Sequence, residues 1–185
     1  MRRLSAGLRN INEQLGNIVA WLTIPMVVGT FIITVLRYAF SLNWIWMQEG
    51  MLWLHAVVFM MAAAYTLNRD EHVRVDIFYR EFSPVWKAWV NLLGSVVLLL
   101  PVAGLLIVMS WDYVATSWLI GEGSREAGGL PFPFVPLLKS VIPAAFVLVA
   151  LQGIAIIIDS IAIILARSSE TRAVDHGVGH ADSDN

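Results

Sequence analysis

Residues 85–111 read VWKAWVNLLGSVVLLLPVAGLLIVMSW, and Lys87 is the only charged residue among them. About 20 apolar residues in a helix are enough to cross the hydrocarbon core of a bilayer. A helix on the surface of a soluble protein is apolar along one stripe, whereas this stretch is apolar on all sides. The stretch therefore predicts a transmembrane helix.

Three further stretches have the same character, at residues 16–36, 44–67 and 139–165. The chain is 58% hydrophobic and 14% charged, whereas soluble domains are roughly 45–50% apolar and about 25% charged. Its 185 residues leave no room for a sizeable soluble domain beside four spans. The sequence therefore predicts an all-α membrane protein with four transmembrane helices in one domain, residues 16–166.

Lys and Arg residues gather on one side of the predicted spans. Nine of them lie in the N-terminal tail, in the second connection (residues 68–84) with the nearby Lys87, and in the C-terminal tail. The other side has three, which are Arg37, Arg125 and Lys139. Cytoplasmic segments carry the excess of positive charge, so both ends of the chain are expected in the cytoplasm.

The two ends of the chain differ in character from the spans. Within residues 1–15, apolar side chains recur at spacings of four and three, at Leu4, Leu8, Ile11 and Leu15, with polar residues such as Asn12 between them. This pattern favours a short amphipathic helix on the inner membrane face over an ordinary polar lead-in. Residues 167–185 are rich in Ser, Asp, His and Gly, which predicts a disordered cytoplasmic tail.

Proline marks the borders of the last two spans. Ser83 followed by Pro84 is typical of a helix N-terminus, so the third span is expected to begin there. Within that span, Pro101 removes a backbone donor and predicts a kink. Three prolines between residues 131 and 136 are expected to keep the third connection irregular until the fourth span begins.

Ionisable groups are costly in hydrocarbon, so those in the second span are candidate functional residues. Glu49 lies one turn inside this span, Trp53 shares its helix face, and His55 lies deeper. An ion pair with Arg37, at the end of the first span, is the favoured interpretation of Glu49. A contact with another subunit and a proton or ion relay are the alternatives. For His55, a hydrogen-bonded packing role is favoured over a ligand role.

Two spans carry faces that indicate packing against protein. In the second span one face combines Glu49 with indoles and small residues, and small residues let another helix approach closely. Beside it runs a stripe of polar and apolar residues, which are Gln48, Leu52, His55 and Phe59. In the fourth span a face with seven-residue spacing predicts helix association through Ala145, Gln152 and Asp159.

No constellation in the sequence looks catalytic. There is no cysteine, which removes disulfides and thiolate chemistry. We find no nucleophile beside a base, no metal-ligand cluster and no phosphate-binding glycine loop. The net charge of −2 argues against a nucleic-acid partner. The chain is therefore expected to have no catalytic, cofactor or metal site and not to be an enzyme.

The absence of a catalytic constellation favours an accessory role in the membrane, and two other functions compete with it. One is a small self-sufficient transporter, working as a homodimer with Glu49 as the coupling carboxylate. The other is the membrane anchor subunit of a redox enzyme, holding haem or quinone. A haem held in the membrane needs two axial ligands, and His55 is the only histidine within a predicted span.

Three segments are distinctive in combination. They are RYAF at 37–40 with WMQE at 46–49, AAAYTL at 62–67 with HVRVDIFY at 72–79, and GEGSRE at 121–126 with GGLP at 128–131 and KS at 139–140. In this order and spacing they resemble the small permease subunit of tripartite ATP-independent periplasmic (TRAP) transporters, the DctQ family. The resemblance covers about residues 16–166. The third segment most resembles the mannitol or chloroaromatic branch.

The resemblance implies a role that composition does not show. Such subunits lie in the bacterial inner membrane with four helices and both ends in the cytoplasm. They bind a large permease subunit, which carries the substrate and sodium sites and receives organic acids from a periplasmic substrate-binding protein. The small subunit would then be a fixed scaffold in a sodium-coupled importer.

The third connection would face the periplasm in such a complex. It holds a candidate docking loop for the binding protein, formed by Glu122, Ser124, Arg125 and Glu126, whose charges are of the kind that pair across an interface. The alternative is a solvated loop whose charges belong to the helix ends.

The second connection would be cytoplasmic, with a candidate turn at His72, Arg74 and Asp76. Asp76 is expected to bond His72 or Arg80 and to brace the turn into the third span. Bracing is favoured over ligand binding.

Overall fold

All regular structure in the computed structural model, which describes residues 2–68 and 82–181, is helical. The helices are α1 (Arg2–Trp21), α2 (Thr23–Phe40), α3 (Ile45–Asn68), α5 (Pro84–Gly94), the π-helix η1 (Ser95–Leu99), α6 (Leu100–Leu119) and α7 (Phe134–Ala181). Within these ranges, four stretches are long and apolar enough to cross a membrane: Asn12–Phe40, Ile45–Leu67, Pro84–Leu119 and Phe134–Arg167. The predicted all-α class with four spanning helices is confirmed.

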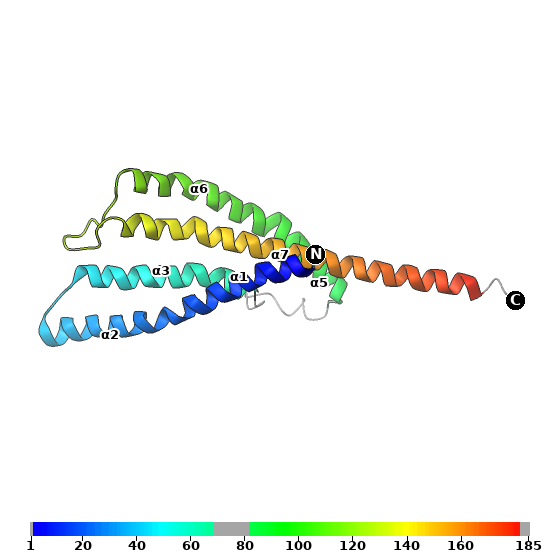
Figure 1. Ribbon diagram of the computed structural model, residues 1–185, viewed down its shortest axis with the longest axis horizontal. Helices are drawn as coiled ribbons and strands as arrows, with labels where there is room; N and C mark the ends of the chain where they lie inside the picture. Colours follow the sequence, from blue (N-terminus) through cyan, green and yellow to red (C-terminus); the bar gives the residue numbers. More distant parts are fainter. Residues whose placement is uncertain (1, 69–81, 182–185) are drawn as a thin grey trace.

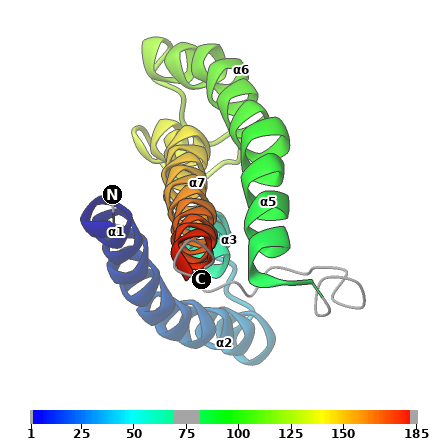
Figure 2. The ribbon, with the colours of Figure 1, turned by 90° about the vertical axis from the view of Figure 1, so that its right-hand side faces the viewer.

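Helix α7 is the centre of the bundle. It packs against α1, α3, α5, η1 and α6, whereas α2 packs against α3 and α1. Viewed from its end, α7 lies between the α1–α2 arm and the α5–α6 arm (Figure 2). The α2–α3 and α6–α7 connections lie together at one end of the molecule (Figure 1). Helices α3 and α6 make no extensive contact with each other.

The first span is broken at Leu22, rather than at the expected boundary between residues 15 and 16. Helix α1 continues through Gly16 to Trp21, and α2 begins at Thr23. Pro25 has no backbone N–H to donate to the Trp21 carbonyl, so the hydrogen-bond ladder is interrupted at this point. The span then runs to Phe40, beyond the expected end at residue 36.

The third span begins where its sequence predicts. Ser83 caps α5, its hydroxyl accepting from the Trp86 N–H at 3.4 Å, and Pro84 occupies the first helical position. The irregularity expected at Pro101 takes the form of the preceding π-helix, in which the Leu100 N–H bonds the Ser95 carbonyl. The span ends at Leu119 rather than near residue 111.

The helix that contains the fourth span begins earlier and continues further than the sequence predicts. Helix α7 starts at Phe134, not at Lys139, because Pro136 falls in the first turn, where its missing N–H has no helical partner to lose. At the other end the backbone stays helical to Ala181, where residues 167–185 were expected to be disordered. The chain has no proline beyond residue 143 to interrupt this helix.

Helices α1 and α3 come close together at Gly16. A Cβ atom built at this position would lie 2.8 Å from the Cβ atom of Tyr65, closer than side-chain atoms normally come. By contrast, Gly104 on α6 has open space where a Cβ would stand. The α1–α3 contact therefore depends on a glycine, and the α6 surface at Gly104 does not.

We expect Gly16→Val to lower the free energy of unfolding by about 1–3 kcal/mol, because overpacking forces the two helices apart. The measurement is thermal unfolding of the purified full chain in detergent. Gly104→Val is the matched control and should unfold close to the wild type. Equal melting temperatures for the two variants would show that the close approach at Gly16 does not matter.

Candidate functional site

The connection between α6 and α7, residues 120–133, is held in shape by its own hydrogen bonds. The Ser124 N–H donates to the Leu130 carbonyl at 2.9 Å, and the Gly129 N–H donates to the Glu126 carbonyl at 3.0 Å. The Glu126 N–H donates to the Ser124 hydroxyl at 3.1 Å. These bonds turn the Leu130 N–H and the Ser124 hydroxyl toward α3.

The Glu49 carboxylate of α3 is bound by this loop. Its Oε2 atom accepts a hydrogen bond from the Leu130 N–H at 2.7 Å, and its Oε1 atom accepts one from the Ser124 hydroxyl. A Cβ atom at Gly129 would lie 2.7 Å from the same Oε2 atom, so only glycine leaves room for the carboxylate. Hydrogen bonds to carboxylates are among the stronger ones, so Glu49 fastens α3 to the connection.

A second bond reinforces this contact one turn further along α3. Trp53 donates its indole N–H to the Phe134 carbonyl at 3.1 Å. Glu49 and Trp53 are four residues apart and therefore share a face of the helix. Together with Ser124 and Leu130 they line a small cavity of about 170 Å³. Helix α3 is thus bound both to the connection and to the first residue of α7.

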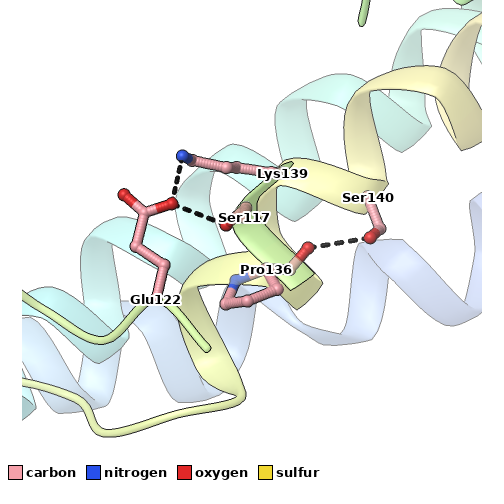
Figure 3. Close-up of polar contacts among 5 residues, drawn as sticks. All are labelled: Ser117, Glu122, Pro136, Lys139 and Ser140. Atoms are coloured by element: carbon pink, nitrogen blue, oxygen red, sulfur yellow. Dashed lines mark hydrogen bonds and ion pairs between the residues drawn. The ribbon is translucent and has the colours of Figure 1, made fainter. Parts of the chain in front are cut away.

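The other side of the connection carries an ion pair between Glu122 and Lys139 (Figure 3). The Lys139 ammonium lies 2.5 Å from Glu122 Oε2, and the Ser117 hydroxyl donates to the same oxygen at 2.6 Å. Lys139 also lies 4.0 Å from the centre of the Tyr113 ring, a cation–π geometry. The pair joins the first part of the connection to the second turn of α7, at the border of a cavity of about 690 Å³.

The electrostatics of this pair favour the charged form of Glu122. The hydrogen bond from Lys139, followed by that from Ser117, holds the pKa of Glu122 below its ordinary value, although partial burial acts in the opposite direction. A carboxyl group with a lowered pKa stabilises the folded protein above its unfolded pKa. That contribution is lost as the pH falls through the folded pKa.

A buried amide pair links α1 to the middle of α7. Asn12 Nδ2 donates to Gln152 Oε1 at 3.0 Å, and the two side chains are 2% and 0% exposed. The Gln152 face was predicted from its seven-residue spacing with Ala145, which is also buried. Asn12 was grouped with the polar residues of the N-terminal helix, but it lies on the face that packs against the bundle.

The structure brings together only some of the site residues that the sequence predicts. Glu49, Trp53 and Ser124 meet in one cluster, while Arg37 is exposed on the last turn of α2 and is not part of it. The Leu130 N–H and the Ser124 hydroxyl occupy the place expected for Arg37. His55 is exposed on α3, and its ring stacks on Phe59 at 6.5 Å.

The remaining predicted residues have different surroundings. Glu122 is turned inward to Lys139, whereas Arg125 and Glu126 are exposed on the connection. The candidate turn at His72, Arg74 and Asp76 lies outside the described residues. Lys139 and Ser117 were not recognised as site residues. The one signal for Lys139 was a charge near the predicted start of a span.

The arrangement is suited to fastening helices together. Within the parts of the chain that the structure describes, no group of three or more His, Asp or Glu side chains is placed to hold a metal ion. Glu49 has two hydrogen-bond donors and Glu122 has a cation and a hydroxyl, so the polar atoms are satisfied by one another. Such a network fixes the α6–α7 connection to both α3 and α7.

Glu49→Ala should lower the free energy of unfolding by about 1–3 kcal/mol, because the Leu130 N–H loses its acceptor. Glu49→Gln keeps a carbonyl oxygen for that N–H and should cost less. Chemical or thermal unfolding of the full chain in detergent measures both. Unchanged stability in Glu49→Ala would mean that the carboxylate does not hold the connection.

Acidification should destabilise the wild-type chain more than Glu122→Gln, because only the wild type loses a charged partner of Lys139 as the pH falls. Melting temperatures of both proteins are measured from neutral pH downward through the range where carboxyl groups titrate. The difference between the two curves isolates Glu122 from the other carboxylates. Parallel curves would contradict the ion pair.

Residues 26–162 match the family model described as tripartite ATP-independent periplasmic transporters, DctQ component. The chain is also 27% identical over 96 residues to the C4-dicarboxylate TRAP transporter small permease protein DctQ of Vibrio cholerae serotype O1 (strain ATCC 39315 / El Tor Inaba N16961). That match covers 52% of this chain and 41% of the relative.

No solved structure matches the chain. Neither similarity tests the expected resemblance to the mannitol or chloroaromatic branch. The family match extends from the first span into the fourth and covers well over half of the residues. This chain therefore belongs to the DctQ family of small components of tripartite ATP-independent periplasmic transporters.

Proposed function

We propose that this chain is the fixed membrane scaffold of a sodium-coupled importer of organic acids. In this proposal it binds a large permease subunit that carries the substrate and sodium sites. A periplasmic substrate-binding protein delivers the substrate to the pair. Membership of the DctQ family supports this role, and the four apolar spans agree with a place in the bacterial inner membrane.

The observation that carries the proposal is the pairing of polar groups within the spans. Glu49 is bound by Ser124 and Leu130, Asn12 by Gln152, and the Trp118 indole N–H by the Ser140 hydroxyl at 3.0 Å. A coupling carboxylate has to exchange protons or ions during a transport cycle. Glu49 instead has a structural task, which favours a scaffold over a self-sufficient homodimeric transporter.

The proposed orientation puts the α2–α3 and α6–α7 connections in the periplasm. The Lys and Arg bias supports this, because the opposite side of the spans has most of the positive charge. Both termini and the turn containing His72, Arg74 and Asp76 then lie in the cytoplasm. For that turn we keep the proposal that Asp76 braces the entry into the third span.

The α6–α7 connection is the proposed contact for the binding protein. Of its four candidate residues, Glu122 and Ser124 are already engaged within the chain. Arg125 and Glu126 are exposed and remain for an external partner. Because Glu49 and Lys139 hold the loop, it offers these two charges from a fixed position, and charges at an interface rim act mainly on the association rate.

We expect the purified chain to bind a large permease subunit when the two are co-expressed, and to transport nothing by itself in liposomes. With both subunits and the binding protein present, sodium-dependent uptake of an organic acid should appear. Glu49→Gln should retain this uptake, because it retains the contact with Leu130. Uptake by the chain alone, abolished by Glu49→Gln, would instead establish the self-sufficient transporter.

A spectrum of the same preparation tests the redox-anchor alternative. The scaffold predicts no Soret band and no bound quinone after solvent extraction. We expect no haem, because His55 is the only histidine in a described span and an axial pair would need a second one. A haem spectrum would therefore contradict the proposal.

A further inference from the structure

One face of α3 is largely uncovered by the other described residues. Leu52 and Phe59 are 68% and 70% exposed, and His55 between them is exposed as well. These residues lie at positions i, i+3 and i+7 and therefore form one stripe along the helix. His55 is well inside the span Ile45–Leu67, nearer its middle than either end.

An imidazole ring at this depth needs a hydrogen-bonding partner. Its stacking on Phe59, with 24° between the ring planes, involves the ring face and satisfies neither nitrogen. Among the described residues, no side chain or backbone group bonds those nitrogens. Lipid tails offer no donor or acceptor, so polar side chains inside membranes face protein or water-filled cavities.

Rotation of α3 does not provide that partner, because its other faces are already engaged. Glu49 and Trp53 bind the α6–α7 connection and the start of α7. Met51 packs on Gly29 of α2, and Tyr65 packs on Gly16 of α1. The stripe is therefore held outward by contacts on two other sides of the helix.

We propose that the Leu52–His55–Phe59 stripe docks a transmembrane helix of the large permease subunit. This inference rests on the proposed function and names the face that performs it. The partner helix presents a hydrogen-bonding group at the level of His55 and small or apolar side chains against Leu52 and Phe59. Apolar anchors at i and i+7 around a polar residue at i+3 suit helix packing in a membrane.

The outer faces of the two peripheral helices are less suited to this role. On α2 the exposed residues Val27, Phe31 and Val35 are entirely apolar, which suits lipid. On α6 the carboxylate of Asp112 is exposed, but it stands near the end of its span beside the exposed Trp111. Trp is typical of the headgroup region, where water solvates a carboxylate.

Tryptophan substitutions on three faces test the proposal in the co-expressed complex. Leu52→Trp and Phe59→Trp should reduce the large subunit retained by the tagged chain at least tenfold, because added bulk separates the helices. Phe31→Trp on α2 and Val108→Trp on α6 are matched controls. Their positions are 67% and 71% exposed, and retention should stay near the wild-type level.

Substitution of His55 tests the polar contact itself. His55→Leu should weaken retention by about threefold, the effect of losing one typical interhelical hydrogen bond. His55→Asn keeps a donor and an acceptor and should lie closer to the wild type. Thermal unfolding of each variant chain alone should match the wild type, which separates a docking defect from misfolding.

The outcomes distinguish the face from the function. If the wild-type chain retains the large subunit and only Phe31→Trp or Val108→Trp releases it, the stripe is not the docking face and the scaffold role stands. If wild-type chain retains no large subunit, the proposed function itself fails. Release of a second copy of this chain by Leu52→Trp, with the large subunit still bound, would overturn the proposal in favour of a homodimer contact.

Discussion

The Glu49 carboxylate accepts hydrogen bonds from the Leu130 N–H and the Ser124 hydroxyl, and this contact fastens α3 to the connection between α6 and α7. Helices α3 and α6 make no extensive contact with each other, so they are related only through α7 and the connection before it. The Glu49 bonds fix that connection to α3, and the Lys139–Glu122 pair fixes it to α7. Without the first contact, α3 would be held to α7 by apolar packing and the Trp53–Phe134 hydrogen bond.

Polar contacts matter here because of the solvent that surrounds the protein. Between helices in a bilayer the hydrophobic effect is absent, since lipid tails are as apolar as the side chains they touch. Close packing at glycines and hydrogen bonds between helices then set the geometry. The Gly16–Tyr65 contact and the buried Asn12–Gln152 bond are examples of the two, and both join α1 to the rest of the bundle.

The sequence predicts the spans and some of the packing because these depend on local properties. Long apolar runs specify four helices, Ser83 with Pro84 specifies a helix start, and the seven-residue spacing of Gln152 specifies a buried face. The start of α7 was placed too late, because a proline in a first turn resembles a proline in a loop. These features require no knowledge of how the chain returns on itself.

The partners of Glu49 depend on long-range geometry and could not be predicted in this way. A search for a partner considers charged side chains such as Arg37, but Glu49 is bound partly by the Leu130 backbone N–H. Every residue except proline has such a group, so its availability follows only from the shape of the loop. Asn12 was assigned to a polar face for a related reason, since its position between apolar residues of the predicted helix gives no sign of Gln152, its neighbour in space.

The distribution of satisfied and unsatisfied polar groups bears on what kind of subunit this is. A part that moves during transport needs polar groups able to change partners, whereas Glu49, Glu122 and Gln152 have fixed partners within the chain. His55 is different, because it is polar, exposed and within a span. Leaving an imidazole exposed to lipid at this depth is unfavourable. The His55 imidazole avoids contact with lipid only if another protein covers it. A rigid α3 presents the ring to that protein without further rearrangement.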